Sequence, residues 1–270
     1  MKKRIIGLLM AFTLANSLML TGCGGNSESA SPDADHLGRI QSSGKIIIAM
    51  EGQWAPWTYH DESGDLVGYD TEVGQAIADK LGVKAEFIEG EWDGLFAGLD
   101  GGRYDCIING VEITEERSQK YDFTTPYAYI KTALAVASDN TDISSFEDLA
   151  GHTTSNSLGS TYADLAAGYG AEVANVDTLS ETVSMVISGR ADATLNAEVS
   201  FYDYLSEHPD AAIKIVDMTD EASHVSIPLV KGTDNDTLRA EIDKAIDELR
   251  ADGTLGKLSE KYFGTDISSK

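Results

Sequence analysis

Apolar residues along this chain change their spacing in a regular order, from strand-like to helix-like and back. Residues 45–50 (KIIIAM) form a short apolar run, residues 70–82 carry apolar side chains four positions apart, and residues 84–90 alternate. A short helical pattern over 93–102 and a buried apolar run over 104–110 follow. Short apolar or alternating runs predict strands, and the four-residue spacing predicts a helix. This order predicts an α/β fold with parallel strands.

Two of the predicted helices begin with a side chain that can cap them. Asp70 or Thr71 can cap the helix over 70–82, and Thr114 can cap the helix that follows it. The second cap places Arg117 in the first helical turn. A cation there is unfavourable with the helix dipole unless an anion lies beside it. The local pattern therefore predicts an anion next to Arg117.

One segment of the first half recurs in the second half. LDGGRYDCIIN (99–109) matches VISGRADATLN (186–196), and each copy contains a helix end, Gly-Arg-x-Asp, an apolar strand and Asn. Two copies predict two similar lobes with parallel-type sheets flanked by helices. Packing accounts for the glycines and the strands, but it does not explain the polar residues beyond each strand.

Two extended stretches predict connections between the lobes. Residues 124–138 leave lobe one, and residues 222–232 return to it. We therefore predict that lobe one comprises 39–131 plus 224–270 and that lobe two comprises 132–223. Two crossings make lobe two an insertion and allow hinge motion.

Polar residues follow both repeated strands. Residues 109–117 leave the first strand, and residues 196–198 leave the second. In open α/β sheets, ligands bind outside the carboxyl ends of the strands. Two such edges facing each other predict a ligand cleft between the lobes.

The N-terminus predicts export and a lipid anchor. A basic start, KKR, precedes an apolar run over 5–20, as in a secretory signal. LTGC then resembles a bacterial lipobox, in which the cysteine receives lipid and becomes the first residue. We expect a signal peptide over 1–22, lipidation of Cys23, and a flexible tether over 23–38 outside the cell membrane. The alternative is an ordinary secretory signal with an incidental cysteine.

Charge and cysteine content limit which classes of partner the protein can bind and which disulfides it can form. The formal net charge is −25, and removal of the signal peptide would make it more negative still. This argues against binding nucleic acid or lying on anionic lipid, so we expect membrane contact through the lipid anchor only. Cys23 and Cys106 are the two cysteines, and lipidation of the first leaves no disulfide partner. Cys106, between apolar residues, is expected to be a buried and inert thiol.

Five segments, in order, resemble the extracellular amino-acid-binding proteins of ABC importers, which have the type 2 periplasmic binding protein fold. They are GDLVGYDTEVGQAIADKLG, WDGLFAGLDGGRYDCIINGVEITEERSQKYDFTTPYA, SFEDLAG, SGRADATLN and DELRADGTLGKLSEKYFG. The resemblance covers Lys45 to Gly264, and NSLGSTYADL with GRADATLNAEVSFYDYL is most similar to the cystine-binding branch. It implies a protein that closes around a free amino acid and delivers it to a membrane permease. We expect a monomer without cofactor or metal.

The resemblance assigns the ligand's α-carboxylate to Arg117. An arginine side chain donates to a carboxylate in a bidentate manner, which agrees with the anion predicted from the helix start. In lobe two, the resemblance adds backbone N–H groups and a hydroxyl from the turn that contains Ser160 and Thr161. The alternative for Arg117 is an internal ion pair with Glu112 or Glu115.

Other site residues follow from the same resemblance. Trp54 and Trp92 match positions of an aromatic pocket wall, although core packing accounts for them equally well. Gly110 lies at the end of the first repeated strand. Glu51 falls where members of the family that bind cations carry an acid.

Two departures from the family pattern concern carboxylates. Glu112 stands where the family commonly has Ser or Thr, and Ala197 stands where it has the Asp that binds the ligand's ammonium group. An ammonium desolvated in a closed cleft needs an anion. We predict that Glu112 supplies it, with Glu198 beside Asn196 as a second candidate. The alternative is that Glu112 neutralises Arg117 and the site takes a different ligand.

The leading prediction is binding without chemistry. Glu51 favours cystine or a basic amino acid over leucine or glutamate. One alternative is a cyclohexadienyl or prephenate-type dehydratase, with Glu112 or Glu198 as general acid. Another is a ligand-sensing domain that signals through a partner.

Overall fold

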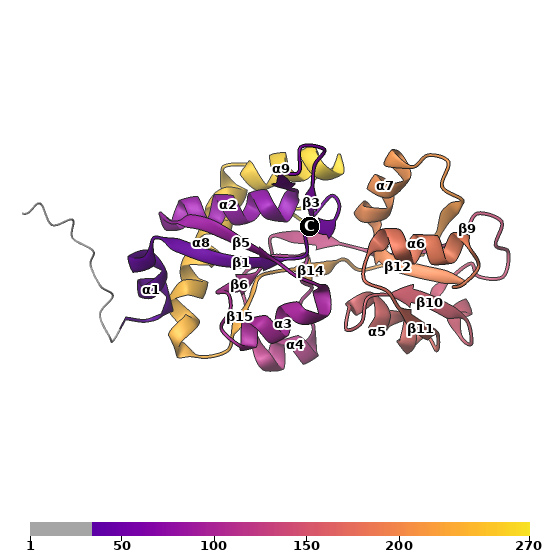
Figure 1. The fold of residues 1–270 in the computed structure, drawn as a ribbon, viewed down its shortest axis with the longest axis horizontal. Helices are drawn as coiled ribbons and strands as arrows, with labels where there is room; N and C mark the ends of the chain where they lie inside the picture. The colour runs from indigo at the N-terminus through magenta and orange to yellow at the C-terminus, as the bar shows by residue number, and fades with distance from the viewer. Residues whose placement is uncertain (1–33) are drawn as a thin grey trace, which may run out of the picture.

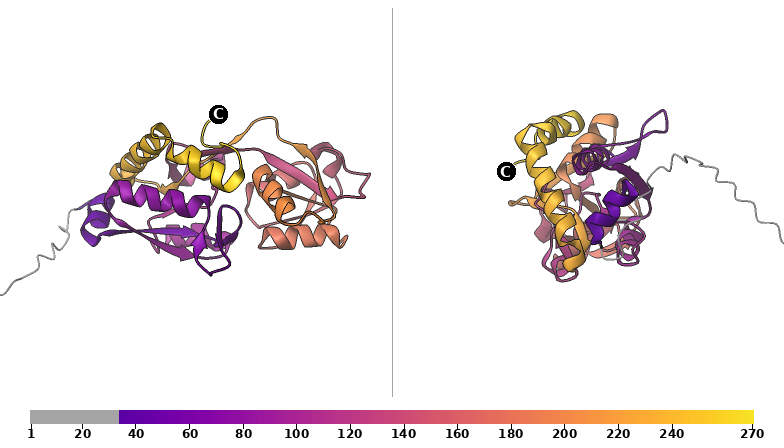
Figure 2. Two further views of the ribbon diagram at one scale, coloured as in Figure 1. Left: turned by 90° about the horizontal axis from the view of Figure 1, so that it is seen from above. Right: turned by 90° about the vertical axis from the view of Figure 1, so that its left-hand side faces the viewer.

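Two lobes lie side by side in the computed structural model, which describes residues 34–270 (Figure 1). Lobe one contains the first and last parts of the described residues, and lobe two contains the middle part. Extended segments connect the lobes, as the view from above in Figure 2 shows. The predicted α/β fold with two lobes is confirmed.

Lobe one is built around a parallel sheet with the strand order β5-β1-β6. The first three predicted strands are present as β1 (Lys45–Met50), β5 (Lys84–Glu89) and β6 (Cys106–Ile107). In the central strand β1, Ile46 and Ile48 are fully buried. This burial explains the nearly continuous apolar sequence of β1, because helices cover both faces of the sheet.

Helices pack above and below this sheet (Figure 1). They are α1 (His36–Ser43), α2 (Tyr69–Leu81), α3 (Trp92–Asp100), α4 (Glu115–Lys120), α8 (Asp236–Ala251) and α9 (Thr254–Phe263). A small sheet of β2 (Gln53–Trp54), β3 (Thr58–His60) and β4 (Leu66–Val67) adjoins them. Helices α1 and α2 pack against α8, and α2 also packs against α9, which joins the two ends of the described chain in one lobe.

Lobe two has a five-stranded sheet with the order β11-β10-β12-β9-β13. Its elements are β9 (Thr132–Ala137), β10 (Thr153–Asn156), α5 (Thr161–Gly168), β11 (Glu172–Asn175), α6 (Leu179–Ile187), β12 (Ala193–Ala197), α7 (Glu198–Glu207) and β13 (Ile213–Met218). Strand β10 pairs in parallel with β11 and β12, whereas β9 pairs antiparallel with β12 and β13. The sheet is therefore mixed, because β9 enters from lobe one and runs opposite to the strands of the repeated unit.

The repeated motif occupies corresponding places in the two lobes, as α3–β6 in lobe one and α6–β12 in lobe two. The connecting segments pair with each other. Strand β8 (Ala128–Ile130) pairs antiparallel with β14 (Ser223–Val225), and β7 (Tyr121–Phe123) pairs with β15 (Pro228–Val230). The predicted boundaries at 131/132 and 223/224 fall at the end of the β8–β14 pair. They remain a prediction about where the hinge bends.

Helix α2 begins differently from the prediction. Its N-cap is Gly68, with a φ of 127° and no side-chain hydrogen bond. A Cβ on Gly68 would lie 2.3 Å from the carbonyl oxygen of Trp57, so the turn requires glycine. Asp70 is instead fully buried and accepts hydrogen bonds from the backbone N–H of Gly110 at 2.6 Å and from Tyr127 Oη at 2.8 Å. Asp70 therefore fixes the strand end beside the cleft rather than the helix end.

The folded part of the chain starts two residues before the predicted end of the tether. Helix α1 begins at His36, and the Asp35 side chain caps it by accepting the backbone N–H of Gly38. His36 Nε2 lies 2.7 Å from Asp105 Oδ1, and these contacts attach α1 to lobe one. The predicted signal peptide and the predicted lipidation site at Cys23 lie outside the described residues.

The remaining cysteine is in the core. Cys106 is free and buried, and burial raises the pKa of its thiol well above the usual range. Its sequence-predicted burial is confirmed. Within residues 34–270, no helix is both long enough and apolar enough to cross a membrane.

Candidate ligand-binding site

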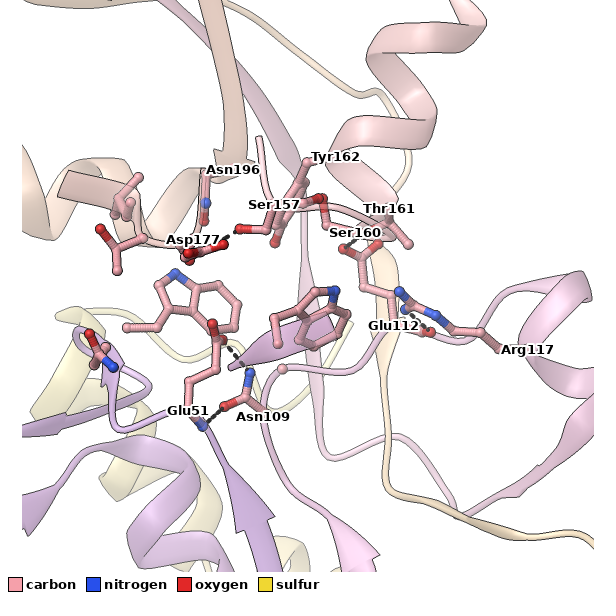
Figure 3. A pocket seen from close by; sticks show the side chains of 16 residues that line it. Glu51, Asn109, Glu112, Arg117, Ser157, Ser160, Thr161, Tyr162, Asp177 and Asn196 are labelled. Atoms are coloured by element: carbon pink, nitrogen blue, oxygen red, sulfur yellow. Dashed lines mark hydrogen bonds between the residues drawn. The ribbon is translucent and has the colours of Figure 1, made fainter. Parts of the chain in front are cut away.

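A pocket lies between the two lobes (Figure 3). Lobe one lines it with Glu51, Gln53, Trp54, Trp92, Asn109, Gly110, Glu112 and Arg117. Lobe two lines it with Ser157, Ser160, Thr161, Tyr162, Asp177, Thr178, Leu179 and Asn196. Every residue predicted to bind the ligand lines this pocket, except Glu198.

Strand ends bring these residues together. Glu51 follows β1, Asn109 lies just beyond β6, Ser157 follows β10, Asp177 lies just beyond β11, and Asn196 is near the end of β12. The strands that carry these residues point their carboxyl ends toward the cleft. This is the position at which α/β sheets bind ligands.

Arg117 lies in the first turn of α4, as the capping pattern predicts. Thr114 Oγ1 accepts the backbone N–H of Arg117 at 3.1 Å. The guanidinium donates from Nη1 to the carbonyl oxygen of Glu112 at 3.0 Å, and from Nη2 to the carbonyl oxygen of Gly159 at 3.1 Å. Since Gly159 belongs to lobe two, Arg117 connects the lobes. An ion pair of Arg117 with Glu112 or Glu115 is not among the contacts of residues 34–270.

The charge of Arg117 is incompletely balanced by the protein. Burial lowers the pKa of the guanidinium, and the nearby charge of Glu112 acts in the opposite direction. The Arg117 Cζ atom lies 5.3 Å from the ring centroids of both Trp92 and Phe96. Aromatic faces attract a cation, but they do not neutralise it. The site therefore favours an anion next to Arg117.

Glu112 makes a second connection between the lobes. Its side chain is 5% exposed, and its Oε1 atom accepts a hydrogen bond from Thr161 Oγ1 at 2.7 Å. Figure 3 shows Glu112 between Arg117 and Thr161. A carboxylate and a guanidinium thus lie next to each other in one loop, each bonded to lobe two.

The start of α5 faces the same end of the pocket. Ser160 is its N-cap, and Ser160 Oγ accepts the backbone N–H of Ala163 at 3.1 Å. The first N–H groups of a helix have no intrahelical acceptor, and the helix dipole is positive there. Thr161 and Tyr162 are the first residues of α5 and line the pocket. An anion in this position is stabilised from lobe two as well as by Arg117.

Trp54 belongs to both the core and the pocket wall. It is 8% exposed and stacks on the fully buried Trp57, with ring centroids 5.1 Å apart. A Cβ on Gly110 would lie 2.5 Å from the Trp54 ring, and Gly110 has a φ of 57°. Gly110 is therefore required for the close approach of the indole to the strand end. Trp92 is less buried and forms the wall next to Arg117.

Glu51 lies toward the opposite end of the pocket from Arg117 (Figure 3). Its backbone N–H donates to Asn109 Oδ1 at 2.7 Å, and Asn109 Nδ2 donates to Glu51 Oε2 at 2.6 Å. Burial raises the pKa of Glu51 to about 7, and the charges of Glu91 and Asp177 add to the rise. The amide of Asn109 therefore orients a carboxyl group that has no cationic partner within residues 34–270.

Several lining residues were not predicted, and Asp177 is the most informative of them. It lies just beyond β11 and just before α6, whose capping box joins Thr178 and Glu181. The rule of strand ends that pointed to Asn196 applies equally to this position. Tyr162 was also missed. Its hydroxyl is buried without a hydrogen-bond partner among the described residues, and burial raises its pKa.

Glu198 faces the hinge instead of lining the pocket. It is the first residue of α7, and its Oε2 atom accepts the backbone N–H of Lys131 at 2.7 Å. Lys131 separates β8 from β9. Burial raises the pKa of Glu198. The neighbouring Ala197 is fully buried and offers no charge to the cleft.

These features define a two-lobe binding protein with its ligand site between the lobes. Residues 46–265 match the family model of the bacterial extracellular solute-binding proteins, family 3. The chain belongs to this family. It is 36% identical over 271 residues to the L-cystine-binding protein TcyA of Bacillus subtilis, covering 99% of this chain and 100% of that protein.

Solved structures give the same fold. An ancestral arginine-binding protein bound to arginine is 37% identical, with a TM-score of 0.76, and the match covers 82% of this chain and 99% of that one. The L-cystine solute receptor of Neisseria gonorrhoeae in its unliganded open conformation is 42% identical, with a TM-score of 0.59, covering 86% of this chain and 98% of that one. The TM-score is lower for the unliganded open receptor than for the arginine-bound protein.

Proposed function

We propose that this protein binds a polar amino acid between its lobes outside the cell and delivers it to the permease of an ABC importer. One observation carries the proposal. The Arg117 guanidinium of lobe one and the N-terminus of α5 in lobe two meet at one end of the pocket. Together they fit an α-carboxylate, which would stabilise the closed form by contacting both lobes. Relatives named as cystine-binding and arginine-binding proteins support an amino acid as the ligand.

The ligand's ammonium group is assigned to Glu112. This buried carboxylate adjoins Arg117, and one of its oxygens is already held by Thr161. The two opposite charges line the same pocket, as the two charged groups of a zwitterion require. Asn196 and Ser160 complete the polar lining from lobe two.

The ligand's side chain would extend toward Glu51. A carboxyl group there favours cystine or a basic amino acid over leucine or glutamate. Trp54 and Trp92 would enclose the aliphatic part of that side chain.

A ligand screen by thermal unfolding tests this function. The mature protein is scanned with each common amino acid and with cystine. A ligand at a hundred times its dissociation constant adds about 2.7 kcal/mol of stability. We expect cystine or a basic amino acid to raise the midpoint most. The proposal fails if no α-amino acid raises it, or if leucine or glutamate binds most tightly.

Binding without catalysis is part of the proposal. Relatives named as cystine-binding and arginine-binding proteins support it. Incubation with prephenate and arogenate, followed by ultraviolet detection of aromatic product, tests the dehydratase alternative. We expect no product. Turnover by the purified protein would show that it is an enzyme instead.

The partners follow from the same proposal. Lipid on Cys23 would hold a monomer at the outer face of the cell membrane, where its closed form docks on the permease. The sequence LTGC supports the anchor. A ligand-sensing role would need a separate output protein in place of the permease.

A further inference from the structure

We infer that Asp105 positions the ligand site from the start of strand β6, and that the imidazolium of His36 in α1 holds Asp105 in place. Asp105 is a positioning residue, because it lies outside the pocket and would act through Asn109 and Glu51. The inference rests on the proposed binding of an amino acid between the lobes. It goes further because it assigns a role to the Asp of the repeated Gly-Arg-x-Asp motif and to α1, which precedes the family match at residue 46.

Asp105 forms two hydrogen bonds with one residue of the neighbouring strand β1. The backbone N–H of Asp105 donates to the carbonyl oxygen of Ile47 at 2.8 Å, and the backbone N–H of Ile47 donates to Asp105 Oδ2 at 2.6 Å. The pairing of β6 with β1 begins directly afterwards, with Cys106 opposite Ile48. Because β6 has only two residues, few ladder hydrogen bonds fix its register. The carboxylate of Asp105 therefore sets where β6 begins relative to β1.

The opposite end of the same strand pair lines the pocket. There the backbone N–H of Glu51 donates to Asn109 Oδ1 at 2.7 Å, as the N–H of Ile47 donates to Asp105 at the start. Each of these bonds joins residues 58 positions apart, so both belong to one register. The four residues between them span about 13 Å of extended chain. A shift at Asp105 would therefore displace Asn109 and Gly110 in the pocket wall.

The second copy of the motif makes the same contact in lobe two. The backbone N–H of Asp192 donates to the carbonyl oxygen of Thr153 at 2.7 Å, and the N–H of Thr153 donates to Asp192 Oδ2 at 2.8 Å. His152 Nδ1 lies 3.2 Å from the same carboxylate oxygen. Asp192 also precedes the pocket residue Asn196 by the same interval as in the first copy. The Asp of the motif thus joins neighbouring strands in both lobes, next to a histidine each time.

His36 meets an acceptor at each of its ring nitrogens. Its Nε2 atom lies 2.7 Å from Asp105 Oδ1, and its Nδ1 atom faces Asn235 Oδ1. The orientation of this amide is set by its Nδ2 atom, which donates to the carbonyl oxygen of Val230 at 2.7 Å. An amide oxygen and an ionised carboxylate can only accept, so both ring nitrogens carry a proton. His36 is therefore an imidazolium paired with Asp105.

The charges that face His36 come from three elements. Its hydrogen bond to Asp105 raises its pKa most, whereas burial and the charge of Arg39 on α1 lower it. Asp234 of η2 (Thr233–Asn235) is close enough for His36 to lower the pKa of that carboxyl group. Because the folded-state pKa is raised, the attachment contributes fully below the usual pKa of about 6.5 and is lost as the pH rises through the raised value. His36 should thus hold Asp105 more firmly in acidic than in alkaline conditions.

Calorimetry and hydrogen exchange on the mature protein test the inference, with arginine and cystine as the ligand probes. The variants are Asp105→Ala, Asp105→Asn and His36→Gln. The control is Asp79→Ala, because Asp79 is an exposed acid on α2 of the same lobe and lies outside the pocket. All measurements are made well below the unfolding temperature, where a loss of stability alone leaves the affinity of the folded protein unchanged.

Asp105→Ala should weaken the tighter of the two ligands by about tenfold. It should also speed hydrogen exchange of the Glu51 and Gly110 amides, because the pocket end of the strand pair would be less firmly held. Asp105→Asn keeps an acceptor for the N–H of Ile47, so most of the affinity should remain. His36→Gln should speed the same exchange to a smaller extent, and Asp79→Ala should change neither property.

The effect of pH is measured on the unfolding midpoint. The wild-type protein should be more stable than His36→Gln at about pH 6, and this difference should shrink by about pH 9 as the imidazolium loses its charge. Glu51 titrates in the same range in both proteins, so its contribution cancels in the comparison. In the Asp105→Asn background, His36→Gln should have a much smaller effect, because the ion pair is already lost.

The results separate this inference from the proposed function. Unchanged affinity and unchanged exchange of the Glu51 and Gly110 amides in folded Asp105→Ala would overturn the inference. A stability difference for His36→Gln that does not depend on pH would overturn it as well, and so would equal weakening by Asp105→Asn and Asp105→Ala. If Asp105→Ala does not fold, exchange and the pH-dependent stability of His36→Gln still decide. Binding of neither arginine nor cystine would count against the proposed function, while the exchange of the pocket amides would still decide on Asp105.

Discussion

At the scale of single residues, the site is a set of charges whose partners are missing or shared between lobes. Arg117 donates to two carbonyl oxygens, Glu112 accepts from Thr161, and Glu51 is held by Asn109. Each bond positions a charge without neutralising it. The ligand's own charges would therefore supply the missing partners, which makes the effects of single substitutions large.

Replacing Arg117 with alanine should weaken amino-acid binding by about 2–5 kcal/mol, because a desolvated carboxylate loses its bidentate donor. The fold should persist, since Thr114 caps α4 through the backbone of residue 117 rather than through its side chain. Arg117→Lys should rescue binding poorly, because lysine lacks the planar fork. Titration calorimetry measures both variants. Near-normal affinity of the alanine variant would remove Arg117 from the site.

Glu112→Gln tests whether the carboxylate binds the ligand's ammonium group. The glutamine oxygen can still accept the Thr161 hydroxyl, so the variant removes charge and keeps shape. Affinity for the zwitterion should fall by about 3 kcal/mol, because the buried ammonium loses its anion. The same variant is tested with an analogue of the bound amino acid that lacks the α-amino group. Its affinity should change far less. Equal losses for both ligands would show that Glu112 only supports Arg117.

The raised pKa of Glu51 predicts a pH dependence of binding. With a pKa of about 7 in the ligand-free pocket, Glu51 gains a proton as the pH falls through 7. A bound cation favours the carboxylate and lowers this pKa, so affinity for a basic amino acid should decrease as the pH falls from 8 to 6. Calorimetry at several pH values gives the slope. Glu51→Gln should abolish it, and an unchanged slope in that variant would assign the titration elsewhere.

At the scale of elements, α7 connects lobe two to both the hinge and lobe one. Glu198, its first residue, accepts the backbone N–H of Lys131 at the hinge. Ser200 Oγ accepts the indole N–H of Trp57 from lobe one at 3.0 Å, and both residues are fully buried. Helix α7 also packs against α9. These contacts connect the lobes without involving a ligand.

Ser200→Ala should shift the lobes toward the open form and weaken ligand binding by about 1–3 kcal/mol, because the Trp57 N–H would stay buried without an acceptor on closure. Calorimetry measures the loss, and small-angle scattering with and without ligand measures the shape. Ser206→Ala, at an exposed position of the same helix, is the control and should have no effect. Unchanged affinity in Ser200→Ala would show that this bond does not contribute to closure.

At the scale of the whole molecule, two lobes joined by paired strands line one pocket from both sides. The β8–β14 pair lies where the chain passes between lobes, and the site residues lie on the facing strand ends. A ligand that bridges the lobes stabilises the closed form in proportion to its preference for that form. Under the proposed function, a permease would distinguish the loaded protein by its shape.

The proposed anchor predicts where the molecule is found. Cys23→Ala should release the protein into the medium or the soluble fraction, because one end of the chain would lose its lipid. Fractionation followed by immunoblotting shows the distribution. Mass spectrometry of the membrane-bound wild-type protein should find a lipidated Cys23, and an unmodified cysteine there would contradict the anchor.

The sequence by itself determined the features that depend on neighbouring residues. Apolar spacing predicted β1, β5 and α2, and the Thr114 cap predicted the position of Arg117 in α4. The repeated motif and the two extended stretches predicted the two-lobe arrangement, and the family resemblance added the role of Arg117. Spacing and capping act within a few residues, so one stretch of sequence is enough to read them.

Only the tertiary structure decided which residues from distant segments share a site. Asp70 looks like a helix cap in sequence, yet it is buried against Gly110 and Tyr127, because the turn before α2 uses Gly68 instead. Glu198 follows Asn196 closely in sequence but faces the hinge, since α7 starts there and turns its first side chain to Lys131. Asp177 and Glu51 line one pocket from opposite lobes, and no local spacing in the sequence records that pairing. Long-range packing sets such pairings, and it depends on the whole chain at once.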